Sequence, residues 1–262
     1  MQRRNFLIST VLSIGLLVGL VASVGSPATA ATPIQPGARI VSGNSACTMN
    51  FIYREILEEP DNSVSFREDP TGERRTGRSG DSDAATFTEE PRLFAGTAGH
   101  CVSGVGARVS TDDGAFGTVA FRRLDDAAGN DFAFIEIDRD KEHLVNPTML
   151  GFDGPNGVIS GREAQVGDGA HVYGHGLIFG ETEFTRPRSG TLTRSDSTSY
   201  GATLPIIFGD SGGPVLHEDG SALGIIAHVV VALDLTTLDG NTVEHALRVA
   251  AADGLNMEVV PG

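Results

Sequence analysis

The chain has 262 residues, 40% of them hydrophobic and 20% charged, so it can fold around a sizeable core. Its formal charge is −15, which disfavours nucleic acid and anionic lipid surfaces as partners because both carry negative charge. The 34 glycines, 12 prolines and many short apolar runs predict strands joined by turns rather than long helices.

Residues 1–30 have the character of an export signal. Arg3-Arg4 precedes an apolar run from Phe6 to Val24, and Ala28-Thr29-Ala30 is a small-residue cleavage site. We therefore expect a signal peptide, of the general or the twin-arginine type, and an extracellular mature protein. The apolar run is long for a signal peptide, so an uncleaved membrane anchor is the alternative.

The first half of the mature chain begins with a short leader or propeptide, residues 31–39. Cys47 to Tyr53 is predicted to be a strand. Residues 54–92 crowd acidic and arginine residues with few apolar ones, which predicts a solvated excursion inserted between two paired strands. Apolar character then returns, and strands are predicted at 93–96, 107–110, 116–121 and 132–137.

A Gly- and Asp-rich stretch, residues 151–167, is predicted to join the two halves of the chain. One helix is expected in the second half: Asn241 and Glu244 form a capping-box-like start, and Gly254 can end it. The second-half strands are predicted at 170–173, 181–185, 190–195, 203–208, 214–217, 222–231 and 255–260.

The chain contains two cysteines, Cys47 and Cys101, and no Cys-x-x-Cys spacing that would indicate zinc. In an exported protein we expect the two to form a disulfide, with free buried thiols as the alternative. The closed loop would hold about 54 residues and stabilise the fold by roughly 4 kcal/mol in the chain-entropy model.

One stretch has the composition of a nucleophile turn: Gly209-Asp210-Ser211-Gly212-Gly213-Pro214. A nucleophilic serine needs backbone that bends sharply and approaches a substrate carbonyl, and glycine permits both. The N–H groups of Gly209 and Ser211 would then stabilise an oxyanion. An ordinary Gly-rich turn is the alternative, so the chain must also supply a base and an orienting acid.

His100 is the candidate base, because of the seven histidines it alone follows a glycine in a tight turn beside the expected disulfide. A neutral imidazole takes a proton from serine and returns it to a leaving amine when a carboxylate fixes its tautomer. Asp131 is the best candidate for that carboxylate, since it lies at the mouth of a predicted strand. The alternatives are Asp125, Asp126 and Asp138.

Three motifs occur in one order: Thr97-Ala98-Gly99-His100-Cys101, Asn130-Asp131 and the Gly209–Pro214 stretch. They resemble the active-site motifs of the chymotrypsin-like (trypsin-fold) serine proteases, closest to the secreted bacterial branch of the streptogrisins and alpha-lytic protease. The resemblance covers about residues 40–262. It implies an all-β fold of two six-stranded antiparallel β-barrels, about 40–150 and 151–262, with the active site between them and one C-terminal helix.

The resemblance also implies an activity, peptide hydrolysis through an acyl-enzyme. Ser211 would be the nucleophile, His100 the base and then the acid, and Asp131 its orienting group, with the N–H groups of Gly209 and Ser211 as the oxyanion hole. We expect a monomer that acts on peptides or proteins, without cofactor or metal and without a membrane once the signal is cleaved. The alternatives are a secreted serine esterase and an inactive protease-like binding protein.

The resemblance places the specificity pocket at six residues that depart from the family pattern: Pro205, Ile206, Phe208, Ala227, His228 and Val229. Pro205 stands where Arg/Lys-specific relatives carry Asp, and Ala227 stands where a Ser usually supports the triad Asp. Valine in place of glycine narrows the pocket, which favours small or medium apolar side chains. His228 either attracts an acidic substrate residue or is a core histidine. Ile207 replaces a cysteine of many relatives, so their second disulfide cannot form.

Asp210 needs a cation, and two sources are open. Arg39-Ile40-Val41-Ser42-Gly43 resembles an activation site whose cleavage frees an amine to pair with Asp210, although Ile40 lies unusually close to Cys47. The alternative is an internal arginine, namely Arg186, Arg188 or Arg194.

Overall fold

The computed structural model describes residues 33–57, 90–125, 129–176, 186–231 and 236–262. The predicted signal peptide lies outside the described residues, as do most of the predicted insertion and the strand predicted at 181–185. Within the described part of the chain, no helix has the length and apolar character needed to span a membrane.

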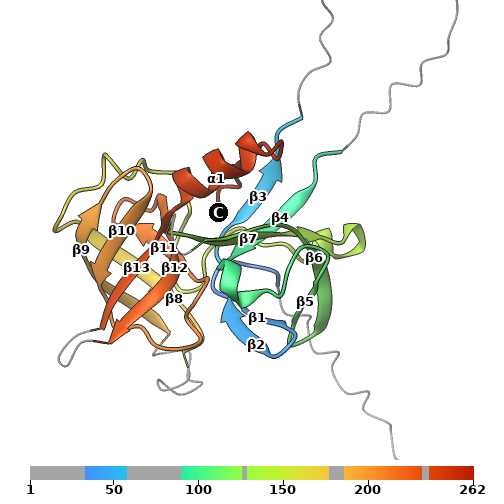
Figure 1. The fold of residues 1–262 in the computed structure, drawn as a ribbon, viewed down its shortest axis with the longest axis horizontal. Helices are drawn as coiled ribbons and strands as arrows, with labels where there is room; N and C mark the ends of the chain where they lie inside the picture. Colours follow the sequence, from blue (N-terminus) through green and yellow to red (C-terminus); the bar gives the residue numbers. More distant parts are fainter. Residues whose placement is uncertain (1–32, 58–89, 126–128, 177–185, 232–235) are drawn as a thin grey trace, which may run out of the picture. The chain divides into compact units, whose positions relative to one another are not determined.

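The first sheet has eight strands in the order β14-β3-β4-β7-β6-β5-β1-β2, with every pairing antiparallel (Figure 1). It is an open, curled sheet where a six-stranded barrel was predicted. One of its two edge strands, β14, comes from the C-terminal end of the chain and pairs with β3. The strands are β1 Arg39–Ser42, β2 Ser45–Thr48, β3 Ile52–Glu55, β4 Leu93–Thr97, β5 Arg108–Thr111, β6 Gly114–Asp125, β7 Asn130–Ile137 and β14 Met257–Val259.

The second sheet is a closed barrel in the order β10-β13-β12-β11-β8-β9, which confirms the predicted six-stranded barrel in the second half. The strands predicted at 214–217 and 222–231 are confirmed to the residue. The strands are β8 Gly169–Tyr173, β9 Pro187–Ser195, β10 Ser199–Thr203, β11 Pro214–His217, β12 Ala222–Val231 and β13 Thr236–Thr242.

In this part of the chain one strand prediction was wrong and one strand was missed. The strand predicted at 203–208 is instead β10, which ends at Thr203, and residues 204–208 form the loop that leads to Ser211. β13 was not predicted because Thr236–Thr242 is mostly polar and lacks an apolar alternation; it forms because both of its edges pair, with β10 and with β12.

The C-terminal helix α1 spans Val243–Ala252 and begins one residue later than predicted. Thr242, not Asn241, caps it: the Thr242 hydroxyl accepts the His245 N–H at 3.2 Å. Glu244 does not close a capping box, because its carboxylate accepts from Ser160 Oγ at 2.9 Å. Gly254 follows the helix with φ +89°, as expected of a glycine after a helix end.

The two ends of the predicted insertion are held together. β3 and β4, which flank it, pair in register from Ile52 opposite Ala95. Arg92 closes its base with ion pairs to Glu55 at 2.6 Å and to Glu136 at 3.0 Å.

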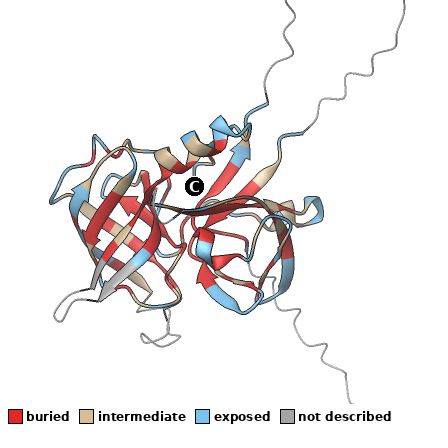
Figure 2. Ribbon diagram, viewed as in Figure 1, coloured by how far each residue is buried: buried red, intermediate tan, exposed pale blue. Residues whose placement is uncertain are grey.

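Three apolar clusters form the core, and Figure 2 shows buried residues along the strands of both sheets. One lies in the first sheet and one fills the closed barrel. The third joins them, because it contains Phe132 and Phe134 of β7, Leu216 and Ile225 of the barrel, and Val243 of α1. This shared cluster fixes the start of β7 against the barrel, and the candidate site lies at that junction.

Candidate active site

His100 and Asp131 form the pair that the sequence predicted. His100 lies in a 3₁₀ turn, Gly99–Cys101, after β4, and Asp131 is the second residue of the neighbouring strand β7. The carboxylate accepts from His100 twice, from Nδ1 at 2.6 Å and from the backbone N–H at 2.8 Å. A carboxylate only accepts, so Nδ1 carries the proton and Nε2 is left as the basic nitrogen. Asp131 is 1% exposed.

The turn before His100 requires glycine for lack of space. A Cβ on Gly99 would stand 2.3 Å from the Arg123 carbonyl oxygen and 3.1 Å from Asp131 Oδ1. The Gly99 carbonyl accepts from Arg122 Nε at 2.8 Å. The backbone therefore approaches β6 closely enough to bring His100 over Asp131.

Ser211 is brought to the same place through its backbone. Its carbonyl oxygen accepts the Thr48 N–H at 2.9 Å and lies 3.7 Å from Cys101 Sγ, in the residue that follows His100. The predicted disulfide between Cys47 and Cys101 is present and joins β2 to the His100 turn. Among the described residues no hydrogen bond links the Ser211 hydroxyl to His100; such bonds are often long before substrate binds.

The loop before Ser211 leaves two donors directed at no protein acceptor. Among the described residues, the N–H groups of Gly209 and Ser211 make no hydrogen bond, whereas the N–H of Asp210 donates to the Ile207 carbonyl at 3.0 Å. Gly209 has φ +106°, and a Cβ there would lie 2.7 Å from the His175 carbonyl oxygen. Only glycine fits that conformation without strain, so the residue type fixes the direction of the two donors.

The first sheet holds this loop of the barrel through side chains that the sequence did not single out. The Thr48 hydroxyl donates to the Gly209 carbonyl at 2.9 Å and accepts the His175 N–H at 3.1 Å. Asn50 Nδ2 donates to the Gly212 carbonyl at 3.0 Å. Thr48 and Asn50 are both fully buried, so these bonds are shielded from competing water.

Arg188 supplies the cation for Asp210. The two form a buried, two-point ion pair, with Nη1 2.6 Å from Oδ2 and Nη2 2.8 Å from Oδ1. The backbone N–H groups of Gly176 and Ile207 donate to the same carboxylate. The internal-arginine alternative is therefore correct. Asp210 therefore does not need the amine that a cleavage after Arg39 would free, and Ile40 itself lies inside β1, paired with Cys47.

His175 is a half-buried histidine behind the Gly209 loop, and no sequence motif marks it. Its Nε2 is buried and has no hydrogen-bond partner among the described residues. Desolvation by burial, with a smaller contribution from Arg186, lowers the pKa of His175 to about 4. The side chain is therefore neutral near pH 7.

The six predicted pocket residues differ in how far they are exposed to solvent. Phe208 is 69% exposed and Pro205 is also exposed, whereas Ile206 is 1% exposed and packs in the barrel core. Ala227 is buried, and Val229 lies in β12 opposite Leu238. His228 is exposed at a register shift in β12, so the prediction of a core histidine was wrong.

Within the described part of the chain, one grouping brings three metal-ligand side chains together: Cys47, His100 and Cys101. Two of its members are bonded to each other as the disulfide, so neither offers the thiolate that a metal needs. The three side chains lie together because the disulfide is close to the His100 ring.

Comparisons with known proteins agree with the fold. No family model matches the chain, and no curated protein matches it in sequence. Among solved structures, Thermobifida fusca protease A is 20% identical with a TM-score of 0.56, covering 87% of this chain and 99% of its own. A Nocardiopsis protease is 17% identical with a TM-score of 0.55, covering 86% and 98%. A serine protease described as glutamic acid specific, with a histidine triad in substrate binding, is 18% identical with a TM-score of 0.53, covering 87% and 100%.

The chain thus has the fold of the bacterial chymotrypsin-like serine proteases, as its three motifs predicted. At identities of 20% and below, this likeness establishes the architecture. The chemistry has to be argued from the residues of this chain.

Proposed function

We propose that the chain is a secreted serine endopeptidase that works through Ser211, His100 and Asp131. The observation that carries the proposal is the His100–Asp131 pair, with Nδ1 2.6 Å from the carboxylate, beside the Ser211 backbone on a protease fold. A buried carboxylate that holds one imidazole nitrogen leaves the other free to act as a base.

In the proposed mechanism His100 Nε2 removes the proton of the Ser211 hydroxyl while Ser211 Oγ attacks the peptide carbonyl carbon. The carbonyl oxygen becomes an oxyanion, which the N–H groups of Gly209 and Ser211 stabilise. His100 then gives its proton to the leaving amine as the C–N bond breaks, and an acyl-enzyme remains. A water molecule then attacks the acyl-enzyme with His100 as the base, and His100 returns the proton to Ser211 Oγ as the carboxylic acid product leaves. Loss of one oxyanion donor typically raises the barrier by about 2.7–4 kcal/mol.

A fluorophosphonate probe tests the nucleophile, because it phosphonylates an activated serine whatever the natural substrate is. We expect the mature protein to be labelled at Ser211, and labelling to be lost in Ser211→Ala and strongly slowed in His100→Ala and Asp131→Asn. Ser103→Ala, an exposed serine near the disulfide, is the matched control and should label normally. The proposal would be contradicted if the protein took no label, or if labelling persisted in Ser211→Ala.

Labelling does not separate a peptidase from an esterase, so the substrate class needs its own measurement. We expect cleavage products from a mixed peptide library, dependent on Ser211. Hydrolysis of simple esters alone would favour the esterase, and neither activity would favour a binding protein. The same library also measures the side-chain preference of the specificity pocket. A narrowed pocket predicts cleavage at small or medium apolar residues. His228 is exposed, so a preference for glutamate that is lost in His228→Ala would assign His228 to substrate binding.

Secretion is part of the proposal and rests on the first 30 residues and on the disulfide, a bond typical of oxidising compartments. We expect the protein in the culture medium to start near Ala31 and to be monomeric in size-exclusion chromatography. A cell-associated protein that keeps its first residues would instead indicate an anchor.

A further inference from the structure

One side chain of the closed barrel binds the backbone on both sides of Asn130, in the first sheet. Asn241, on β13, accepts the Asp131 N–H through Oδ1 at 2.8 Å and donates from Nδ2 to the Gly129 carbonyl at 2.9 Å. Its carboxamide thus makes the two bonds that a neighbouring strand would make. The direction of the amide is fixed, because a backbone N–H only donates and a carbonyl only accepts.

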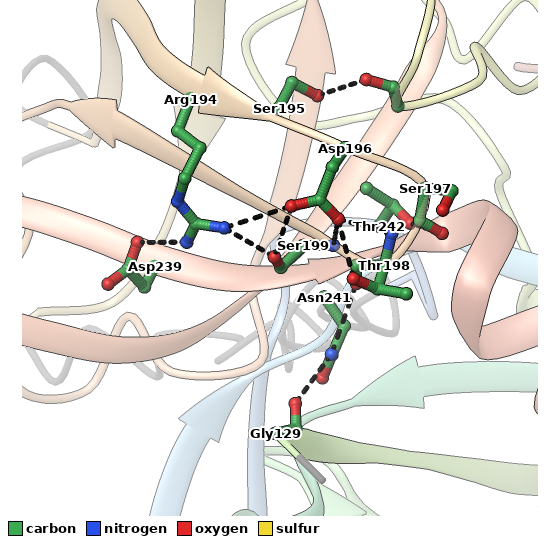
Figure 3. A network of polar contacts seen from close by, with 11 residues as sticks. Gly129, Arg194, Ser195, Asp196, Ser197, Thr198, Ser199, Asp239, Asn241 and Thr242 are labelled. Atoms are coloured by element: carbon green, nitrogen blue, oxygen red, sulfur yellow. Dashed lines mark hydrogen bonds and ion pairs between the residues drawn. The ribbon is translucent and has the colours of Figure 1, made fainter.

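Asn241 is in turn held rigidly by its own barrel (Figure 3). It is 3% exposed, and its backbone pairs with Ser199 and Ile225 on the two neighbouring strands. Nδ2 also lies 3.4 Å from the Thr198 carbonyl, at the turn between β9 and β10. Asp196 closes that turn by accepting the Thr198 N–H at 2.8 Å.

The carboxylate of Asp131 depends on this backbone support. In the described part of the chain its only hydrogen-bond donors belong to His100, the group it has to orient. Ala227 stands where the resemblance expects a serine hydroxyl, and a methyl group donates nothing. Since no other described side chain is bonded to the carboxylate, its position follows from where the Asp131 backbone is fixed.

We propose that Asn241 is a positioning residue for the catalytic acid, and that it sets the His100–Asp131 pair of the first sheet in register with Ser211 of the barrel. This inference rests on the proposed peptidase function. Asn241 touches neither substrate nor reacting atoms; it acts through Asp131.

Removing the carboxamide leaves the buried Asp131 N–H without its acceptor and the part-buried Gly129 carbonyl without its donor, so the segment from Gly129 to Asp131 has to move to recover hydrogen bonds. We expect Asn241→Leu, which keeps the volume and loses both bonds, to slow fluorophosphonate labelling about 10- to 100-fold. The loss should lie in the maximal rate, with half-saturation by the probe nearly unchanged. Asn241→Gln, which keeps the amide one methylene further out, should recover part of the rate.

A double-mutant cycle separates positioning from general damage. In an Asp131→Ala background, where no carboxylate remains to be placed, Asn241→Leu should slow labelling by less than about 3-fold. The matched control is His245→Ala, which removes a different side-chain bond to the start of β7, the one from His245 Nε2 on α1 to Asn130 Oδ1 at 2.7 Å, and does not touch Asp131. It should leave labelling within about 3-fold of wild type.

A second readout needs no activity. In Ser211→Ala protein, the proton NMR resonance of His100 Nδ1–H should lie downfield, move on Asn241→Leu, and stay in place on His245→Ala. The inference is overturned if Asn241→Leu labels at the wild-type rate, if it slows the Asp131→Ala enzyme by the same factor, or if the resonance does not move. Failure of the wild type to take label would instead defeat the peptidase proposal, while the resonance would still report on Asn241.

Discussion

Arg188, on β9, and Asp210, the residue before Ser211, form a two-point ion pair that is shielded from solvent. Asp210 Oδ1 and Oδ2 also accept the N–H groups of Gly176 and Ile207. The ion pair therefore ties β9 to the loop whose N–H groups point at the proposed oxyanion. It also makes the loop independent of a newly formed N-terminus.

Arg188→Leu should accordingly disable the site and weaken the fold. It leaves a buried carboxylate unpaired, and breaking one partner of such a pair typically costs about 3–5 kcal/mol. We expect a lower midpoint of urea unfolding and strongly slowed labelling of Ser211. Arg39→Gln is the informative partner: it removes the candidate cleavage site and an exposed ion pair with Asp112, and it should label normally. An inactive Arg39→Gln protein would revive the activation hypothesis.

Thr48 should strongly affect the rate of Ser211 labelling, although it lies far from Ser211 in the sequence. Its hydroxyl donates to the Gly209 carbonyl and accepts the His175 N–H, so it holds the loop that carries the proposed oxyanion donors. Thr48→Val keeps the shape and removes both bonds. We expect labelling to slow about 5- to 150-fold, from the roughly 1–3 kcal/mol lost when buried groups are left unpaired. Thr48→Ser keeps the hydroxyl and should stay close to wild type; equal rates for Val and Ser would contradict the prediction.

The motif residues were predictable because each is marked by its immediate neighbours in the chain. His100 follows a glycine that no other residue can replace, and Gly209 is forced by a positive φ. Thr48 and Asn241 carry no such mark, since their partners lie 161 and 110 residues away. Arg188 was one of three candidates, and only the fold distinguishes them.

The errors in the predicted elements have a related cause. Asn241 was read as a helix cap because Asn is a good capping residue. In the structure its amide is already engaged by Asp131 and Gly129, and Thr242 caps α1 instead. The long-range hydrogen bonds of Asn241 outweigh its local preference for a helix cap. The residue at which this happens is the one that we propose positions Asp131.

The disulfide should stabilise both the fold and the His100 turn. Cys47 and Cys101 close a loop with a sequence separation of 54, worth roughly 4 kcal/mol in the chain-entropy model. We expect the Cys47→Ala, Cys101→Ala double variant to unfold at lower urea and to label more slowly at equal folded fraction. Non-reducing peptide mapping of the wild type should show the two linked. Two alkylatable thiols in native protein would contradict the pairing.

His217 should give the protein a pH-dependent stability that has nothing to do with the active site. It is 7% exposed, with Nε2 3.0 Å from Asp168 Oδ2 and Nδ1 3.0 Å from Asp219 Oδ1. Burial by itself would lower the pKa of His217, but the hydrogen bonds to the two carboxylates outweigh it and raise the pKa above 6.5. The folded state therefore favours the charged imidazolium.

The sign of the effect follows from that raised pKa. The stabilisation from His217 is fully present below about pH 6.5, the pKa of the unfolded chain, and is lost as the pH rises through the folded value. The free energy of unfolding should therefore fall between pH 5.5 and 8.5 more steeply in wild type than in His217→Gln. His143→Gln, at an exposed histidine, should follow the wild type. If the gap between wild type and His217→Gln stayed constant or widened with rising pH, His217 would be neutral in the folded protein.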